Sequence, residues 1–359
     1  MTESRPIALR SGIIGTGFIG GVHAYGVRAA GGRLTRVADV TPEAASRAVT
    51  LLGAEAAAAS AEELIASSEV DVVHICTPNA THAALAQLAI EHGKAVICEK
   101  PLAITVGDAE ALTAAASAAG VVAAVPFIYR FHPNVRDIRQ RISAGQAGSI
   151  WLLHGSYLQD WLSRNADTNW RVDPKLGGVS RAFGDIGVHW CDLMEFATGQ
   201  RIVRLAARTA NAFENRTGTE DGAVIIFETN EGAAGSLVVS QVSPGRKNRL
   251  WFSFDGTDAS YSFDQETPDL LWIGGRDESR LLLRDPAQEY PDARRLSRLP
   301  AGHPQGYQDA FSSFIGDVYA AVRGEGVDGL PTFSDGLRAA RITAAVVASA
   351  ADSSWTEVA

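Results

Sequence analysis

The sequence predicts an α/β protein of two domains, in which a doubly wound parallel sheet is followed by a largely antiparallel sheet. Three observations predict this class. The chain has 359 residues, which corresponds to roughly two domains of about 100–200 residues each. Strand-like and helix-like segments alternate through residues 1–125, as in a parallel sheet covered by helices. In residues 126–359, strand-like segments follow one another without long helices between them.

The composition is that of a globular protein. Hydrophobic residues make up 46% of the chain and charged residues 20%, with a formal net charge of -9. An acidic surface gives no electrostatic reason to bind nucleic acid or an anionic membrane. The sequence has no run of about 18 apolar residues, and its first residues are too polar for a signal peptide. Three widely spaced cysteines in apolar runs favour free thiols and a cytoplasmic protein: Cys76, Cys98 and Cys191.

A glycine-rich turn near the N-terminus predicts a dinucleotide site. In SGIIGTGFIGG, a short apolar strand is followed by Gly15, Gly17 and Gly20 in G-x-G-x-x-G spacing. The first glycine permits the tight turn, the second admits a pyrophosphate, and the third lets helix and strand pack closely. The phosphates would lie at the N-terminus of the following helix. The cofactor contacts expected here come from Gly15, Thr16, Gly17, Phe18 and Ile19.

A carboxylate at the end of the next strand favours NAD over NADP. The predicted strand Leu34–Val40 ends near Asp39, which lies 39 − 20 = 19 residues beyond the third glycine, close to the separation of about 20 typical of this fingerprint. Such a carboxylate accepts hydrogen bonds from the ribose hydroxyls and repels a 2′-phosphate. We therefore expect NAD as the cofactor.

The alternation continues with helices over 43–52, 61–67 and 83–92 and buried strands over 70–76 and 94–98. Ligands of such sheets bind at the carboxyl ends of the strands. Two polar turns occupy those ends, and we expect cofactor contacts from Thr77, Pro78, Asn79, Glu99 and Lys100. His74, within a buried strand, is predicted to be a hydrogen-bonded core histidine. His82, at the start of a helix, is expected to line the cofactor cleft.

The second half of the chain predicts a half-covered sheet. Several segments alternate apolar and polar residues, as in EDGAVIIFET, which is typical of antiparallel strands with one exposed face. A final alanine-rich helix is expected over 334–350, with a Ser–Asp cap. The predicted strands are 150–157, 202–210, 222–228, 235–242, 250–254, 259–263 and 270–273.

The stretch GDIGVHWCDL places Asp185 four residues before His189. On one helix these side chains would be neighbours, and Asp192 would also lie near His189. A metal site needs at least three ligands, and neither HExxH nor a second nearby histidine is present in the sequence, so we expect no metal. Acid–base chemistry and simple capping with packing remain as alternatives.

Seven motifs in order make the chain resemble the Gfo/Idh/MocA family of sugar and inositol dehydrogenases over essentially its whole length: GTGFIG, ADV, TPNATH, CEKPLA, YRFHP, NWRVDPKLGG and GDIGVHWCDL. The resemblance implies an N-terminal Rossmann domain and a C-terminal α/β domain with an open sheet. It implies a homodimer or homotetramer formed through one sheet face, and a last helix that packs back toward the first domain. It also implies that Lys100, Asp185 and His189 form one catalytic constellation.

The residue types suit oxidation of a secondary alcohol by NAD. His189 would accept the hydroxyl proton, Lys100 would stabilise developing charge on oxygen, and Asp185 would orient the substrate. By resemblance, Trp170 and Arg171 contact the cofactor. Other residues suited to holding a polyol are Arg130, Tyr157, Gln159, Trp161 and His303, besides Asp185 and His189. Arg181 stands where the family commonly has a small residue, and it would either recognise a substrate group or project to solvent.

The sequence thus predicts an NAD-dependent oxidoreductase that removes hydride from a ring secondary hydroxyl of a sugar, glycoside or cyclitol, or catalyses the reverse reduction. Two alternatives remain open. Transient oxidation to a ketone acidifies the adjacent C–H, which would permit an oxidoreductive glycosidase with tightly held NAD. A nucleotide-sensing regulator could retain the fold without the chemistry, although the presence of all three catalytic candidates argues against it.

Overall fold

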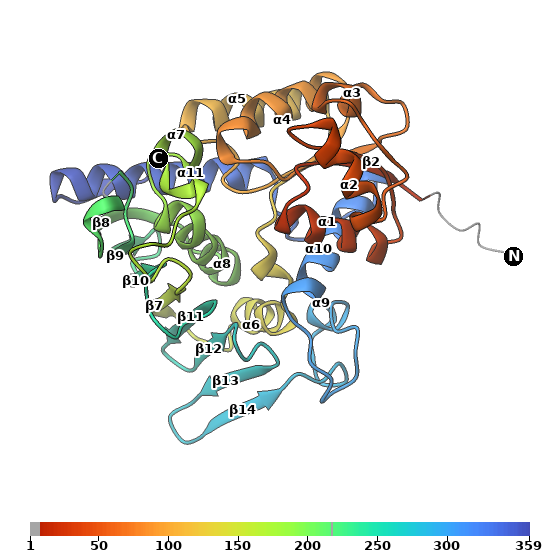
Figure 1. Ribbon diagram of the computed structural model, residues 1–359. Coiled ribbons are helices and arrows are strands. Elements are labelled where there is room, and N and C mark those ends of the chain that lie inside the picture. Colours follow the sequence, from red (N-terminus) through yellow and green to blue (C-terminus); the bar gives the residue numbers. More distant parts are fainter. Residues whose placement is uncertain (1–7, 217) are drawn as a thin grey trace, which may run out of the picture. The chain divides into compact units, whose positions relative to one another are not determined.

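The computed structural model describes residues 8–216 and 218–359 and divides the chain into two compact units (Figure 1). Of the described residues, the first unit contains 8–103, 107–126 and 311–337. The second contains residues 104–106, 127–310 and 338–359. The boundary that we expected after residue 125 lies between Pro126 and Phe127, whereas residues 311–337, expected in the second domain, group with the first unit.

The first unit is built on a six-stranded parallel sheet of order β3-β2-β1-β4-β5-β6. This confirms the predicted doubly wound sheet. The strands are β1 Arg10–Ile14, β2 Arg33–Ala38, β3 Ala56–Ala57, β4 Val72–Ile75, β5 Ala95–Cys98 and β6 Ala123–Ala124. The helices that connect them are α1 Phe18–Ala29, α2 Pro42–Leu52, α3 Ala61–Ala66, α4 His82–Glu91 and α5 Val106–Ala119.

Local signals in the sequence fix the ends of these elements. Thr41 caps α2 by accepting a hydrogen bond from Ala44 N, and Gly53 ends the helix with a left-handed φ of 67°. The core between sheet and helices is formed by small and branched apolar side chains, including Ile13, Val27 and Val37, which are 0% exposed. Alanine on the helices lets them lie close to the sheet.

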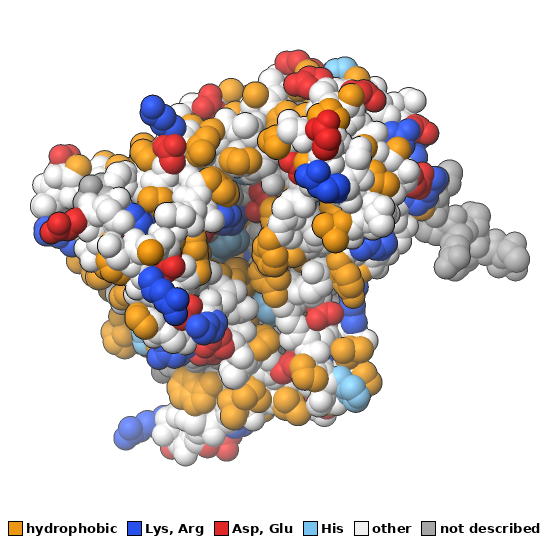
Figure 2. Space-filling view, in the orientation of Figure 1, with side chains coloured by type: hydrophobic (Ala, Val, Ile, Leu, Met, Phe, Trp, Pro, Cys, Tyr) orange, Lys and Arg blue, Asp and Glu red, His pale blue; other side chains and the backbone are white. Residues whose placement is uncertain are grey.

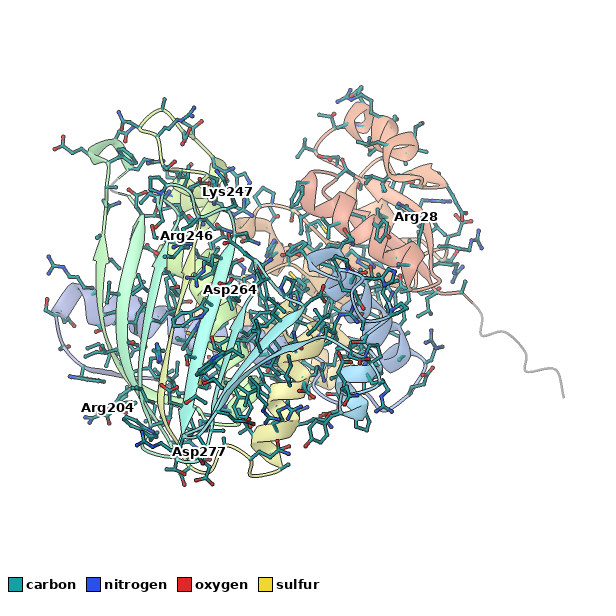
Figure 3. The ribbon with its side chains drawn as sticks, turned by 90° about the horizontal axis from the view of Figure 1, so that it is seen from below. Arg28, Arg204, Arg246, Lys247, Asp264 and Asp277 are labelled. Atoms are coloured by element: carbon teal, nitrogen blue, oxygen red, sulfur yellow. The ribbon has the colours of Figure 1, made fainter. Side chains whose placement is uncertain are left out.

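The second unit is built on a nine-stranded sheet of order β14-β13-β12-β11-β7-β10-β9-β8-β15. All neighbouring strands are antiparallel except β7 and β10. Figure 3 shows the strands side by side, with Arg246 and Lys247 at the opposite end from Arg204 and Asp277. The strands are β7 Ile150–Leu158, β8 Ile202–Ala210, β9 Gly222–Thr229, β10 Ala234–Ser240, β11 Arg249–Gly256, β12 Ser260–Asp264, β13 Leu270–Gly274, β14 Ser279–Leu283 and β15 Thr356–Glu357.

One face of this sheet is buried and the other is exposed, as the alternating pattern predicts. On β9, Ala223, Ile225 and Phe227 are at most 3% exposed, while Val224 and Ile226 between them are 52% and 48% exposed. The helices of this unit include α6 Pro133–Ser143 and α8 Val188–Thr198, and the terminal helix α11 spans Phe333–Asp352.

A glycine on β7 lets α8 approach the buried face. A Cβ at Gly155 would lie 2.3 Å from Nε1 of Trp190, so only glycine leaves room for that indole. Trp190 is fully buried and its Nε1 donates a 3.0 Å hydrogen bond to the carbonyl of Trp251. This contact fixes the position on the sheet of the helix that carries His189.

The surface carries mixed charge, and Figure 2 shows Lys and Arg interspersed with Asp and Glu over the visible face of each unit. None of the helices in the described part of the chain is long and apolar enough to span a membrane. Cys76, Cys98 and Cys191 are free and buried. Among residues 8–216 and 218–359, no group of three or more His, Cys, Asp or Glu is arranged to hold a metal ion.

Candidate functional site

The glycine-rich turn between β1 and α1 has the shape that a dinucleotide requires. Gly15 has a φ of +88°, and a Cβ there would lie 2.6 Å from the carbonyl oxygen of Cys76. A Cβ at Gly20 would lie 2.3 Å from the carbonyl oxygen of Gly15, whereas a Cβ at Gly17 would meet nothing within 4 Å. The first and third glycines are thus required by the fold itself. The second leaves open space at the helix N-terminus, which suits a phosphate group.

Asp39 lies beside this turn, just after β2. Its carboxylate accepts hydrogen bonds from the backbone N–H and the hydroxyl of Thr16 and from the backbone N–H of Val40. Partial burial raises the pKa of Asp39, but the bonds from Thr16 and Val40 outweigh this and hold it below its ordinary value. An ionised carboxylate beside the turn fits the ribose of NAD and disfavours a 2′-phosphate.

A pocket of about 420 Å³ extends from the turn along α1 to the end of α2. Phe18 is 82% exposed at its rim, while Ile19 packs against the apolar core. The pocket is lined by Thr16, Gly17, Phe18, Gly21, Tyr25, Arg28, Leu51 and Leu52.

The turns after β4 and β5 lie side by side, because these strands are parallel neighbours that end at Ile75 and Cys98. Thr77, Pro78 and Asn79 form the first turn, and Lys100 lies in the second between Glu99 and Pro101. The ring of His82 is fully buried between the two turns. Its Nδ1 is 2.8 Å from the carbonyl oxygen of Pro101 and its Nε2 is 2.9 Å from that of Thr77.

A buried polar chain lies behind the Lys100 turn. Nε2 of His23 is 3.0 Å from Oε1 of Glu99, and Nδ1 of His23 is 2.9 Å from Nδ1 of His74. His74 also contacts the Ser11 hydroxyl at 3.1 Å, which confirms it as a hydrogen-bonded core histidine. Burial raises the pKa of Glu99, but His23, Lys100 and His82 outweigh this and hold it below its ordinary value. Glu99 is therefore an ionised, acceptor-only carboxylate.

Asp185 and His189 lie in two consecutive elements of the second unit. We expected one helix to start near Asp185; instead a π-helical turn, Phe183–Gly187, precedes α8. The carboxylate of Asp185 accepts a 2.7 Å hydrogen bond from Nε2 of Gln241 and lies 3.4 Å from Nε of Arg171. Arg171 stacks over the ring of Trp170 at 4.3 Å.

His189 is held by aromatic rings. Its imidazole meets the rings of Tyr129 and Phe127 edge to face, with centroids 5.2 and 5.7 Å away, and it is 7% exposed. Lys100 belongs to the first unit, whereas Asp185 and His189 belong to the second.

A polar cluster adjoins His189, and we define it as Tyr129, Tyr157, Gln159, Trp161 and Asn248. The hydroxyls of Tyr129 and Tyr157 share a short hydrogen bond, and Tyr157 and Gln159 both donate to Oδ1 of Asn248. Nε1 of Trp161 donates to Gln159. Burial raises the pKa of Tyr129 to about 12, despite its hydrogen bonds to Tyr157 and Asn248. Burial also raises the pKa of Tyr157 well above its ordinary value, so both phenols stay protonated at neutral pH.

Sequence reasoning missed Tyr129, Gln241 and Asn248. Tyr129 adjoins Arg130 in YRFHP, so this motif did indicate that the segment belongs to the site. Which of the two neighbouring side chains faces the polar cluster depends on backbone geometry. Gln241 and Asn248 lie in the loop from β10 to β11. Their relevance comes from the order of strands in the sheet, which the sequence does not state.

Two arginines have buried partners. Arg130 is 7% exposed and pairs with the carboxylate of Asp192 through both Nε and an Nη atom. Arg181 is 2% exposed and pairs with Asp221, and it also donates to the carbonyl of Glu220. It does not project to solvent, which was one of the two expectations for it. His303 is exposed, with Nδ1 3.3 Å from the carbonyl of Ala301.

The chain matches two models of one family. Residues 9–127 match the "Oxidoreductase family, NAD-binding Rossmann fold" model, and residues 135–262 match the C-terminal domain model of the same Gfo/Idh/MocA family. Levoglucosan dehydrogenase from Pseudarthrobacter phenanthrenivorans is 31% identical over 387 residues, covering 98% of this chain and 98% of the relative.

Solved structures agree along the whole chain. A levoglucosan dehydrogenase in complex with NADH and levoglucosan has a TM-score of 0.91 at 30% identity, covering 98% of this chain and 99% of the other. An inositol dehydrogenase homologue from Azotobacter vinelandii, in complex with NAD+, has a TM-score of 0.91 at 29% identity, covering 98% and 97%. The predicted fold class, an α/β protein with a parallel and a largely antiparallel sheet, is confirmed.

Proposed function

This chain belongs to the Gfo/Idh/MocA family of NAD-dependent oxidoreductases, and we propose that it transfers hydride from a ring secondary hydroxyl of a sugar, glycoside or cyclitol, or catalyses the reverse reduction. The observation that carries this proposal is the Lys100 turn, which lies at the carboxyl edge of a sheet whose glycine turn and Asp39 fit NAD. We further propose that the first unit holds NAD and the second holds the substrate.

The side chains of this protein would handle the proton and the charge. When bound, NAD supplies the hydride acceptor. His189 accepts the hydroxyl proton, because an imidazole titrates in the neutral range. Lys100 donates a hydrogen bond to the reacting oxygen and stabilises its developing charge. Asp185, held by Gln241 and Arg171, orients the substrate hydroxyl.

The polar cluster next to His189 would recognise the substrate. Tyr157 and Gln159 offer oxygen and nitrogen atoms to ring hydroxyls, and Trp161 offers an apolar ring face. Trp170 and Arg171 remain proposed cofactor contacts, together with Phe18, Ile19 and the Thr77–Asn79 turn. His303 stays a prediction. Arg130, paired with Asp192 inside its unit, would act by positioning the wall of the site instead of binding substrate.

The proposal also covers the self-association of the protein and its location in the cell. The exposed face of the nine-stranded sheet, with Val224, Ile226 and Val238, would join two copies of the chain into a homodimer or homotetramer. We also place the protein in the cytoplasm, because free buried thiols persist in a reducing compartment.

The test is a substrate screen with matched variants. Inositols, aldoses, anhydrosugars and glycosides are offered with NAD and with NADP, and NADH absorbance and aglycone release are measured in parallel. NADH accumulation supports the proposal, whereas aglycone release without NADH would support the oxidoreductive glycosidase. NADH binding without any turnover would support the nucleotide-sensing regulator. Lys100→Met and His189→Ala should each lose roughly 10²–10⁴-fold in kcat; turnover within a few-fold of the parent in both contradicts the assignment.

A further inference from the structure

We propose that two buried histidines, His23 and His82, are positioning residues that hold the Lys100 turn from its two sides. His23 acts through the side chain of Glu99, and His82 acts through the backbone carbonyl of Pro101. This inference rests on the proposed catalytic role of Lys100.

The first side of the turn is held by a carboxylate with two partners. Oε1 of Glu99 lies 3.0 Å from Nε2 of His23, and Oε2 accepts a 3.2 Å hydrogen bond from the backbone N–H of Lys100. Since an ionised carboxylate only accepts hydrogen bonds, Nε2 of His23 carries a proton. His23 comes from α1, so the helix that begins at the glycine-rich turn also fixes the carboxylate that holds the Lys100 amide.

The far side of His23 is also fixed. Its Nδ1 contacts Nδ1 of His74, whose Nε2 contacts Ser11, and the Ser11 hydroxyl is 2.6 Å from that of Tyr319. All four of these side chains are at most 1% exposed. A buried ring with both nitrogens engaged has little freedom to rotate, because each alternative orientation strands a polar group. The carboxylate of Glu99 therefore has a rigid anchor.

The second side of the turn is held by His82, from the start of α4. Burial lowers the pKa of this ring, although the carbonyls of Pro101 and Thr77 and the charge of Glu99 oppose the shift. Both ring nitrogens face backbone carbonyl oxygens, so the ring bridges the two turns, and we infer that Nδ1 carries a proton and donates to Pro101. Lys100 is thus flanked on both sides by residues whose positions are set by an imidazole.

The position of the Lys100 backbone should affect the rate of the reaction. Misplacing a catalytic group by about 1 Å costs about 10²-fold in rate. The amine of Lys100 is at the end of a flexible chain, so its backbone must be fixed for the amine to reach one place reproducibly. Loss of either histidine should therefore lower kcat through Lys100 in variants that still fold.

The experiment compares removal with partial replacement. His23→Leu and His82→Leu should each lower kcat about 10–100-fold. The Nε2 amide of glutamine stands near Nε2 of histidine, so H23Q should recover most of the loss. The Nδ2 amide of asparagine stands near Nδ1 of histidine, so H82N can still donate a hydrogen bond to the carbonyl of Pro101. The amide of glutamine in H82Q would instead face Thr77. The kcat of H82N should therefore be higher than that of H82Q. His92→Leu, at the exposed end of α4, is the matched control and should not change kcat.

The decisive arm repeats both leucine substitutions in the Lys100→Met background. If the histidines act through Lys100, H23L and H82L cause no further loss there. The inference is overturned if H23L and H82L lower kcat by the same factor in both backgrounds. It is also overturned if H82N and H82Q restore kcat equally. The comparison of H82N with H82Q keeps the inference testable if a leucine variant fails to fold. Parent-like turnover of K100M would instead overturn the proposed function, and this inference with it.

Discussion

The carboxylate of Asp39 accepts a 2.9 Å hydrogen bond from the backbone N–H of Thr16, which ties the end of β2 to the glycine-rich turn that we propose as the pyrophosphate site. Asp39→Asn keeps the size of the side chain and an oxygen acceptor but removes its negative charge. We expect KM for NADP to fall relative to KM for NAD by roughly tenfold, about 1.4 kcal/mol, because the repulsion of a 2′-phosphate is gone. Initial rates with both cofactors at saturating substrate measure this ratio.

An exposed carboxylate away from the turn provides the control for the Asp39 prediction. Asp108→Asn, in the first turn of α5, should leave the cofactor ratio unchanged. An unchanged ratio in D39N would mean that the carboxylate does not face the ribose.

Alanine substitutions at two glycines of the turn, Gly17 and Gly20, should produce different defects. An alanine at Gly20 would collide with the backbone of Gly15, so G20A should lower thermal stability as well as NADH binding. An alanine at Gly17 meets no protein atom within 4 Å, so G17A should fold as the parent does yet bind NADH more weakly, because its methyl group fills the space for the phosphate. Thermal melting and NADH fluorescence titration separate the two effects.

Gly107 provides the matched control for these glycine substitutions. It lies in α5, and a Cβ there also meets nothing within 4 Å. G107A should melt no lower than the parent and leave NADH binding unchanged. Equal NADH affinity in G17A and G107A would contradict the placement of the phosphate at Gly17.

Elements with a strong pattern could be predicted from the sequence, and weakly patterned ones could not. The buried strand β4 and the amphipathic strand β9 follow their residue patterns closely. The two-residue strands β3 and β6 are too short to show a period, and α5 is rich in alanine and shows little amphipathic periodicity. The π-helical turn before α8 was missed because i and i+4 spacing looks the same in a sequence whether or not the helix is regular.

The candidate site shows the same limit. Gly15, Asp39 and Lys100 stand in motifs whose chemistry depends on local spacing, so the sequence identified them. The partners that hold the site come from distant segments: Glu99 meets His23 across 76 residues and Asp185 meets Gln241 across 56. Arg181 illustrates a related limit, because its exposure could not be predicted from the sequence and the structure pairs it with Asp221 in the interior.

His132 makes stability depend on pH. Burial lowers its pKa from 6.5 to about 4, although Asp269 opposes the shift. Between these values the unfolded chain binds a proton that the folded protein does not, so stability is lost as the pH falls through this window. The full effect is about 3 kcal/mol, at about 1.4 kcal/mol for each pH unit. Urea unfolding at pH about 6.5 and about 4.5 should show about 2 kcal/mol of this loss.

A phenylalanine substitution isolates the contribution of His132 to this pH dependence. His132 stacks on Tyr129 with ring centroids 5.8 Å apart and contacts Phe263 at 5.3 Å, and H132F keeps an aromatic ring there without the titrating group. We expect H132F to lose less stability than the parent over the same pH range, and His92→Phe at an exposed position to behave as the parent. An identical pH dependence in H132F and the parent would count against the assignment.

The exposed face of the nine-stranded sheet predicts the site of self-association. Val238 on β10 and Val224 on β9 are directly opposite each other and are 41% and 52% exposed, so they form an apolar pair in the middle of the sheet. A stable interface buries about 800 Å² per partner and tolerates no unpaired charge at its centre. Val238→Lys should therefore convert the proposed dimer or tetramer to smaller species in light scattering coupled to gel filtration. Leu51→Lys, at a 78% exposed apolar residue of the other unit, should leave the mass unchanged; a V238K mass equal to that of the parent would place the interface elsewhere.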